Sequence, residues 1–185
     1  MIKQCAVAAA VGAIVLMMAC SSCSSGGSNG DGGSGGGSCK NVAICTVVPA
    51  STVTSAIGLM VSMANPDMPA QNPWNDRCDY ISNDPGKNAR FIRTCFASAS
   101  DASNVFASAK TGSLKSGGTR TDVTGVGDQA FYQSEPTSTM GVSTVKLQAI
   151  KGQVVVSLSD VYVTAADDAT VKQGLTSIAN TLLSQ

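Results

Sequence analysis

The chain has 185 residues, with 12 basic side chains, 12 acidic side chains and no histidine. The balanced charge offers no basic surface for nucleic acid and no polybasic segment for anionic lipid, so neither is an expected partner. The absence of histidine excludes Ser-His-Asp and Cys-His catalysis and histidine-based zinc sites. We therefore expect no catalytic residue and no metal.

Residues 1–19 have the features of an export signal. Lys3 gives a positive start, and an uncharged apolar run follows over residues 6–18. The run is shorter than the about 20 residues of a membrane-spanning helix. Ala19 precedes Cys20, as in a bacterial lipoprotein signal, so we expect Cys20 to be acylated and to become the mature N-terminus. The alternative is an ordinary secretory signal in which Cys20 has no role.

Residues 20–38 are expected to form a tether. After Cys20 the segment contains only serine, glycine, one asparagine, one aspartate and Cys23. Such a composition buries no apolar surface and behaves as a flexible coil, which over about 18 residues spans about 20–25 Å. The sequence thus predicts a single globular domain, residues 39–185, held by lipid on the extracytoplasmic side of the cell membrane or in the outer membrane.

Apolar residues recur at helical spacing in three segments, which begin near residues 51, 100 and 167. Asn65-Pro66 is expected to stop the first helix, so that this helix extends to about residue 64. Two aspartates suit the start of the last helix, where carboxylates face the positive end of the helix dipole. Gly174 lies inside that helix, where glycine costs about 1 kcal/mol relative to alanine.

Apolar and alternating runs predict the strands, with a hairpin before the second helix and a three-stranded meander after it. The expected strands cover residues 79–82, 89–96, 128–133, 144–150 and 153–163, with residues 42–48 as a further short candidate. The order helix, hairpin, helix, meander, helix (α-β-β-α-β-β-β-α) is typical of the α+β class. We expect an antiparallel sheet of about five strands with the helices packed on one face.

The domain contains four cysteines, Cys39, Cys45, Cys78 and Cys95, which fit an oxidising compartment and allow three pairings. If the hairpin turn is centred just after Gly86, Cys78 faces Cys95 at the separation of a disulfide, which leaves Cys39 with Cys45. The competing pairing joins the N-terminal segment of the domain to the hairpin, for example Cys45 to Cys78. The spacings lack the paired C-x₂₋₄-C pattern of a zinc site.

Gly125, Gly127, Asp128 and Ala130 satisfy the dinucleotide-binding pattern G-x-G-x-x-A. That site needs a strand before the pattern and a helix after it, whereas here a strand follows. We interpret the four residues as a structural turn: the glycines turn the chain into a strand, Ala130 packs where space is tight and Asp128 binds nearby backbone amides. No cofactor is expected.

Trp74, Arg77, Tyr80 and Tyr132 form the candidate recognition patch, because aromatic residues and arginine dominate binding hot spots. The alternative is that Trp74 only covers one end of the core. A deep pocket lined by Trp74 and Tyr132 would favour a small ligand, and a flat apolar patch would favour a protein partner.

Three short motifs carry a family resemblance: Cys45, Val48-Pro49, Val53 and Gly58; then Cys78-x-Tyr80; then the G-x-G-D-x-A element over residues 125–130. Together they resemble a group of extracytoplasmic bacterial lipoprotein domains of unknown function, best known in actinobacteria. The resemblance implies a small, disulfide-containing α+β domain tethered outside the cytoplasmic membrane. Related architectures serve as sensor or ligand-binding domains, and the resemblance supplies no catalytic residues.

From these observations we expect a lipid-anchored, non-enzymatic module of the cell envelope that binds a small ligand or an envelope protein. An inhibitor or accessory subunit of another envelope protein is the alternative. A further alternative is an enzyme that uses only Asp, Glu, Ser and Lys, for example one that cleaves glycans with two carboxylates.

Overall fold

The computed structural model describes residues 40–66, 75–84, 87–164 and 166–185. The expected signal peptide, Cys20, the tether, Cys39 and Trp74 lie outside these residues. The chain divides into two units, residues 1–34 and 35–185, and every described residue belongs to the second. None of the described helices is long and apolar enough to cross a membrane.

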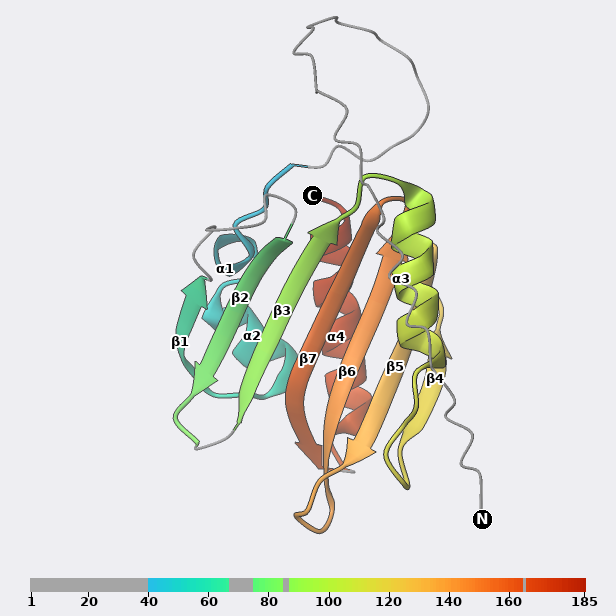
Figure 1. The fold of residues 1–185 in the computed structure, drawn as a ribbon. Helices are drawn as coiled ribbons and strands as arrows, with labels where there is room; N and C mark the ends of the chain where they lie inside the picture. The colour runs from blue at the N-terminus through green and yellow to red at the C-terminus, as the bar shows by residue number, and fades with distance from the viewer. Residues whose placement is uncertain (1–39, 67–74, 85–86, 165) are drawn as a thin grey trace, which may run out of the picture. The chain divides into compact units, whose positions relative to one another are not determined.

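The described residues form one antiparallel sheet of seven strands, in the order β1-β2-β3-β7-β6-β5-β4, together with four helices (Figure 1). The strands are β1 Val61–Pro66, β2 Asn75–Ser82, β3 Asn88–Cys95, β4 Thr119–Val123, β5 Gln129–Pro136, β6 Val142–Lys151 and β7 Val154–Thr164. The helices are α1 Ile44–Val47, α2 Ala50–Ile57, α3 Ala99–Thr111 and α4 Asp168–Leu183. The α+β class and the antiparallel sheet are confirmed, but the sheet has seven strands rather than about five.

The expected helix over residues 51–64 is wrong in its second half. Gly58 has φ +69° and its N–H donates to the carbonyl oxygen of Thr54 (3.0 Å), so a left-handed glycine ends α2. The chain then enters β1, which pairs with β2. The apolar residues at helical spacing beyond Gly58 therefore lead into strand β1. Because their spacing also fits a helix, this strand was not expected; it is the first of two strands that the sequence did not predict.

Two further segments differ from expectation. Residues 42–48, a strand candidate, contain the single-turn helix α1, in which the N–H groups of Thr46 and Val47 both donate to the carbonyl oxygen of Ala43. Strand β4 lies between the second helix and the meander, where no strand was expected. Four of its five residues, Thr119 to Asp122, are polar, which is why hydrophobic patterning does not reveal it.

The helices cover both faces of the sheet, not one. Helices α1, α2 and α4 lie behind the sheet in Figure 1 and α3 lies in front of it. The residues between α3 and the sheet form a small core of their own: Ala102, Phe106, Phe131, Ile150 and Val155. Strands covered on both faces read as continuous apolar runs, and β7 begins with three consecutive valines. This run of valines indicates that helices cover the strand on both faces of the sheet.

The disulfide joins Cys45 to Cys78, with the two Cα atoms 5.4 Å apart. The favoured pairing of Cys78 with Cys95, and with it Cys39 with Cys45, is wrong because the hairpin has another register. Cys78 lies opposite Phe91, four residues from Cys95 along β3. At about 3.3 Å per residue that is about 13 Å, beyond the reach of a disulfide. The alternative pairing, of the N-terminal segment with the hairpin, is the one observed.

Non-reducing peptide mapping is expected to recover a Cys45–Cys78 peptide and a second peptide that joins Cys95 to Cys39. Cys95 is also disulfide-bonded, and Arg93, two residues before it on the same face of β3, donates to the carbonyl oxygen of Lys40 (2.9 Å). Since Cys39 directly precedes Lys40, it is the cysteine nearest in the chain to that contact. A peptide joining Cys78 to Cys95 would contradict this pairing, and the reduced sample is the control.

Candidate functional site

A groove of about 330 Å³ lies where the sheet splits. Strands β3 and β7 pair from Cys95 with Val154 to Arg90 with Ser159. Beyond Ser159, β7 continues to Thr164, and among the described strands only β6 pairs with that part. The gap is lined by the α2–β1 connection, the tip of the β2–β3 hairpin, the ends of β6 and β7, and the first turn of α4. We call this gap the groove.

The floor of the groove is apolar and belongs to the main core. Ile57 and Leu59 come from α2 and the connection after it, Val163 from β7 and Val171 from α4, and all four are buried. Two large apolar residues of the lining are exposed instead: Met60 is 68% exposed and Tyr162 is 38% exposed. An apolar floor with solvent-exposed apolar side chains in its lining is suited to bind another molecule.

The charged groups of the groove already have partners. Lys87 Nζ lies 3.1 Å from Asp84 Oδ2 at the hairpin tip. At the start of α4, Asp167 Oδ2 accepts a hydrogen bond from the hydroxyl of Thr164 (2.6 Å). One lysine against two aspartates leaves the groove with a net charge of −1.

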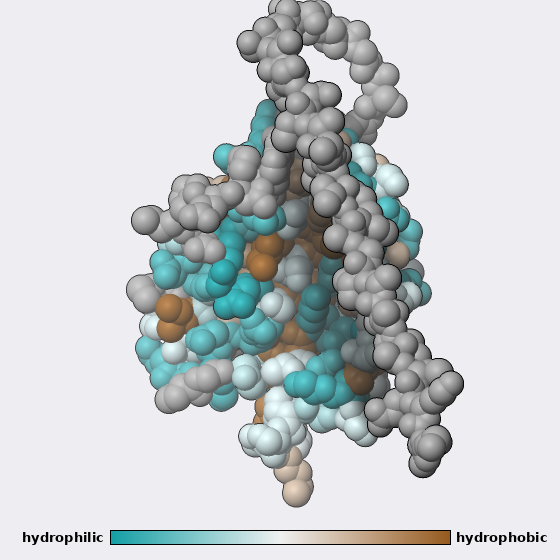
Figure 2. All heavy atoms as spheres, viewed as in Figure 1, coloured by the Kyte–Doolittle hydropathy of each residue, from teal (hydrophilic) through white to brown (hydrophobic). Residues whose placement is uncertain are grey.

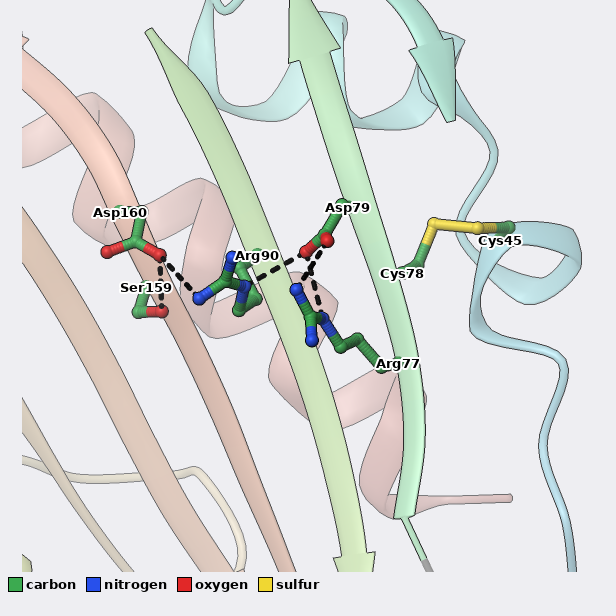
Figure 3. A network of polar contacts seen from close by, with 7 residues as sticks. All are labelled: Cys45, Arg77, Cys78, Asp79, Arg90, Ser159 and Asp160. Carbon is green, nitrogen blue, oxygen red and sulfur yellow. Dashed lines mark hydrogen bonds and ion pairs between the residues drawn. A yellow bond between two sulfur atoms is a disulfide. The ribbon is translucent and has the colours of Figure 1, made fainter. Parts of the chain in front are cut away.

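Four charged residues link β2, β3 and β7 close to the last residue pair between β3 and β7, Arg90 with Ser159 (Figure 3). Arg77 Nη2 lies 2.6 Å from Asp79 Oδ2 on β2, and Arg90 Nε of β3 lies 3.0 Å from Asp79 Oδ1. Arg90 Nη1 then reaches Asp160 Oδ2 of β7, at 3.7 Å. Burial raises the pKa of Asp79, but the two arginine hydrogen bonds outweigh it and the pKa lies below its ordinary value. We call these four residues the brace.

Asp160 has a left-handed backbone, with φ +61°, and is the only described residue other than glycine with a positive φ. The β6–β7 register shifts at this point, between Val145 and Leu147. A bulge bends its strand and increases the twist, and such strained residues gather at functional sites. Here the bulge bends β7 where its pairing with β3 ends, and Arg90 of the brace contacts the bulged residue.

Lys146 occupies a second, smaller hollow of about 150 Å³ beside Asp160, with Glu135 and Ser159 also in its lining. Burial lowers the pKa of Lys146 and Arg120 acts in the same direction, whereas Asp160 and Glu135 act against them.

Figure 2 shows the face of the sheet that is turned toward the viewer in Figure 1. Hydrophilic side chains cover much of this face over β2 and β3, with single hydrophobic residues among them.

The groove and the start of the described chain lie at opposite ends of α4. Arg93 donates to the carbonyl oxygens of Lys40 (2.9 Å) and Leu182 (3.3 Å), which places Lys40 beside the C-terminal end of α4. The groove is lined by Thr170 and Val171 at the N-terminal end of the same helix. The 16 residues of α4 separate the two ends by about 24 Å, at about 1.5 Å per residue.

The structure does not assemble the candidate recognition patch. Tyr80 is buried and donates to the carbonyl oxygen of Val48 (2.6 Å), and Tyr132 is buried and donates to Asp168 Oδ1 (2.7 Å). Arg77 neighbours Cys78 on β2 and therefore points to the opposite face of the sheet, where it joins the brace. Trp74 lies outside the described residues. The two tyrosines are core residues with satisfied hydroxyl groups.

The buried tyrosines predict a loss of stability at alkaline pH. Burial raises the pKa of Tyr80, and burial together with Asp168 raises that of Tyr132. In the unfolded chain both titrate near pH 10, so the folded state holds the protons longer and the free energy of unfolding falls above about pH 10, by up to about 1.4 kcal/mol per pH unit for each tyrosine. Urea unfolding between pH 8 and about 11.5 measures this.

The Tyr80→Phe and Tyr132→Phe variants should each flatten this alkaline decline. Tyr162→Phe is the matched control, because Tyr162 is part of the exposed lining of the groove and its hydroxyl has no described hydrogen bond. The control should follow the parent profile. A decline of equal steepness in all variants would show that other groups cause it.

The turn motif lies away from the groove. Gly125 and Gly127 have φ +78° and +54°, and a Cβ on Gly127 would overlap the carbonyl oxygen of Ile150. Asp128 Oδ2 accepts a hydrogen bond from the N–H of Gly152 (2.7 Å), and Ala130 is buried. These residues attach the start of β5 to the β6–β7 turn, which is a structural role.

Sequence reasoning missed the residues of the groove. Met60 was assigned to a helix, and Tyr162 was counted as part of a strand without a role of its own. One signal was available: Ser159 and Asp160 are two consecutive polar residues in β7, and such a break in the alternation of a strand accompanies a bulge. The other groove residues are brought together only by the tertiary fold.

The chain matches no family model and no curated protein. Among solved structures it is similar to the extracellular domain of PknH from Mycobacterium tuberculosis, with 13% sequence identity and a TM-score of 0.44. The similarity covers 80% of this chain and 100% of that chain. So distant a likeness says nothing about what this chain binds, and its function has to be inferred from its own geometry.

Proposed function

We propose that this protein is a lipid-anchored, non-enzymatic module of the bacterial cell envelope, which binds a ligand or protein partner in the groove on the extracytoplasmic side. The acylated Cys20 would hold it to the cell membrane or outer membrane. Residues 20–38 would be the tether, and residues 39–185 the binding domain.

The position of the groove carries this proposal. The chain enters the domain at Lys40, beside the C-terminal end of α4, and the groove lies at the other end of that helix. A domain held through its N-terminal segment therefore has the groove and its point of attachment at opposite ends of α4. A flexible tether with a span of about 20–25 Å would leave the groove free to meet a partner.

Three features support the remaining parts of the proposal. The signal and Cys20 favour an anchor, as does the resemblance to extracytoplasmic lipoprotein domains. The Cys45–Cys78 disulfide suits an oxidising compartment. The charged groups of the groove are paired with one another or with a hydroxyl, an arrangement suited to recognition and not to acid–base chemistry.

The binding proposal can be tested with a photo-crosslinking amino acid placed at one position at a time in native cells. Met60 and Tyr162 mark the groove, and Gln173, on the exposed side of α4, is the control. We expect the same product from positions 60 and 162 and none from position 173. Equal products from all three positions, or a product from position 173 alone, would place the binding surface elsewhere.

The anchor is tested by the Cys20→Ala variant in the same cells. Cell fractionation should find the parent protein in membranes and the variant in the soluble fraction, with loss of fatty-acid labelling. Retention of an unlabelled variant in membranes would contradict the lipid anchor but would leave the groove as a binding site.

A further inference from the structure

We infer that the groove takes an extended polypeptide segment with apolar and basic side chains, which adds as a strand to the free edge of β7; this inference rests on the proposed function. It names the class of partner, a peptide segment of another envelope protein, and the mode of binding. Four observations on the described residues lead to it.

The first observation is an unpaired strand edge inside a cavity. From Asp160 to Thr164, β7 pairs with β6 on one side, and no described strand pairs with it on the other. Past the bulge at Asp160, the main-chain N–H and C=O groups that face this side need partners, except the carbonyl oxygen of Thr164, which accepts a hydrogen bond from the N–H of Asp167 (3.1 Å). A second extended chain supplies partners at the same spacing, which is how peptides bind by strand addition.

The second observation concerns size. The stretch from Asp160 to Thr164 is about 16 Å long, at about 3.3 Å per residue. Its last three residues, Tyr162–Thr164, line the groove of about 330 Å³, so about three residues of an added segment, about 10 Å long, would lie in the groove. The occupant is therefore a short part of a longer chain that enters and leaves the groove.

The third observation concerns the side chains. In an added strand, alternate side chains point to the same face. Side chains that point toward the floor of the groove would contact Leu59, Val163 and Val171. Those that point toward solvent would contact Met60 or Tyr162. Apolar side chains at every second position match this lining.

The fourth observation concerns charge. Asp84 and Lys87 neutralise each other across 3.1 Å, which leaves the Asp167 carboxylate, held by Thr164, as the net charge of the groove. A lysine or arginine next to the apolar positions of the segment complements that charge. An acidic segment would face repulsion there.

The test uses a display library of random 12-residue peptides, selected on the lipidated full chain in detergent. Enriched peptides are then synthesised with one N-methylated amide at a time. Strand addition predicts that methylation weakens binding at every second residue, because alternate N–H groups face β7. It also predicts an excess of basic over acidic residues among the selected peptides.

The Met60→Ala and Tyr162→Ala variants should weaken the binding of these peptides at least tenfold. Met140→Ala is the matched control, because Met140 is 97% exposed and does not line the groove. All three side chains are exposed, so the thermal unfolding temperature should stay within a few degrees of the parent.

Three results would overturn the inference: no enriched peptide, N-methyl effects without a period of two, or binding that the Met60 and Tyr162 variants leave unchanged. These results are distinct from failure of the proposed function. If crosslinking at positions 60 and 162 in cells captures a lipid or glycan, the groove remains a binding site while the polypeptide occupant is wrong.

Discussion

Replacing Gly174 with alanine is expected to destabilise the domain by about 3 kcal/mol, although alanine alone would favour the helix by about 1 kcal/mol. A Cβ at this position would overlap the carbonyl oxygen of Ala56 and would lie 2.6 Å from its carbonyl carbon. Helices α2 and α4 thus approach each other with backbone against backbone. The alanine can be accommodated only if the two helices move apart, which disrupts the core above which the groove lies.

Gln173→Ala is the control for this prediction, because Gln173 is the neighbouring residue on the exposed side of α4. It should change the free energy of unfolding by less than about 0.5 kcal/mol. Urea unfolding, followed by circular dichroism, measures both variants. A Gly174→Ala protein as stable as its parent, or more stable, would show that the close approach of the two helices is wrong.

Replacing Arg93 with methionine should cost about 3–5 kcal/mol, because it leaves the partners of a buried cation without their donor. Arg93 is 2% exposed. Its guanidinium lies 3.3 Å from Asp76 Oδ2 and donates to the carbonyl oxygens of Lys40 and Leu182. The residue therefore links the start of the described chain, β2 and the end of α4.

The control for Arg93 is Arg90→Met, three residues away on the other face of β3. The side chain of Arg90 is 44% exposed, and its ion pairs with Asp79 and Asp160 should contribute at most about 1 kcal/mol. The double variant Arg93→Met/Asp76→Leu should recover part of the loss, since it removes the uncompensated carboxylate. Equal, small losses for both arginine variants would contradict the buried link.

The parts of the fold that sequence predicts correctly are those with a long local pattern. The stripe of Val171, Leu175, Ile178 and Leu182 fixes α4 without reference to the rest of the chain, and all four residues are buried. The strands of the meander follow from apolar runs of the same kind. Such segments bury one surface against whatever covers them, so their pattern is sufficient.

The errors occur where a local pattern allows two structures. The apolar residues after Gly58 fit a helix and a strand equally well, and the left-handed glycine decides between them. The hairpin was expected in the right part of the chain, but the strand pairing centres its turn two residues earlier than expected, so Cys78 faces Phe91 and lies four residues from Cys95. Register depends on the packing of the whole face, which a turn sequence does not encode.

The candidate site was the least predictable part. Tyr80 shares a strand face with Cys78, two residues before it, and both are buried. That spacing indicates a core residue and could have removed Tyr80 from the recognition patch. The groove, by contrast, combines Met60, the hairpin tip around Asp84, and Tyr162, which are far apart in the chain. No local signal connects them.

Amide hydrogen exchange of the lipidated protein in its native membranes, compared with the same protein purified in detergent, tests the central claim most directly. If a partner occupies the groove in the envelope, peptides covering the end of β7 around Tyr162 will exchange more slowly in the native membranes. Helix α3, which covers the other face of the sheet, will exchange equally in both samples. Equal exchange at the end of β7, with protection over α3 instead, would contradict the account.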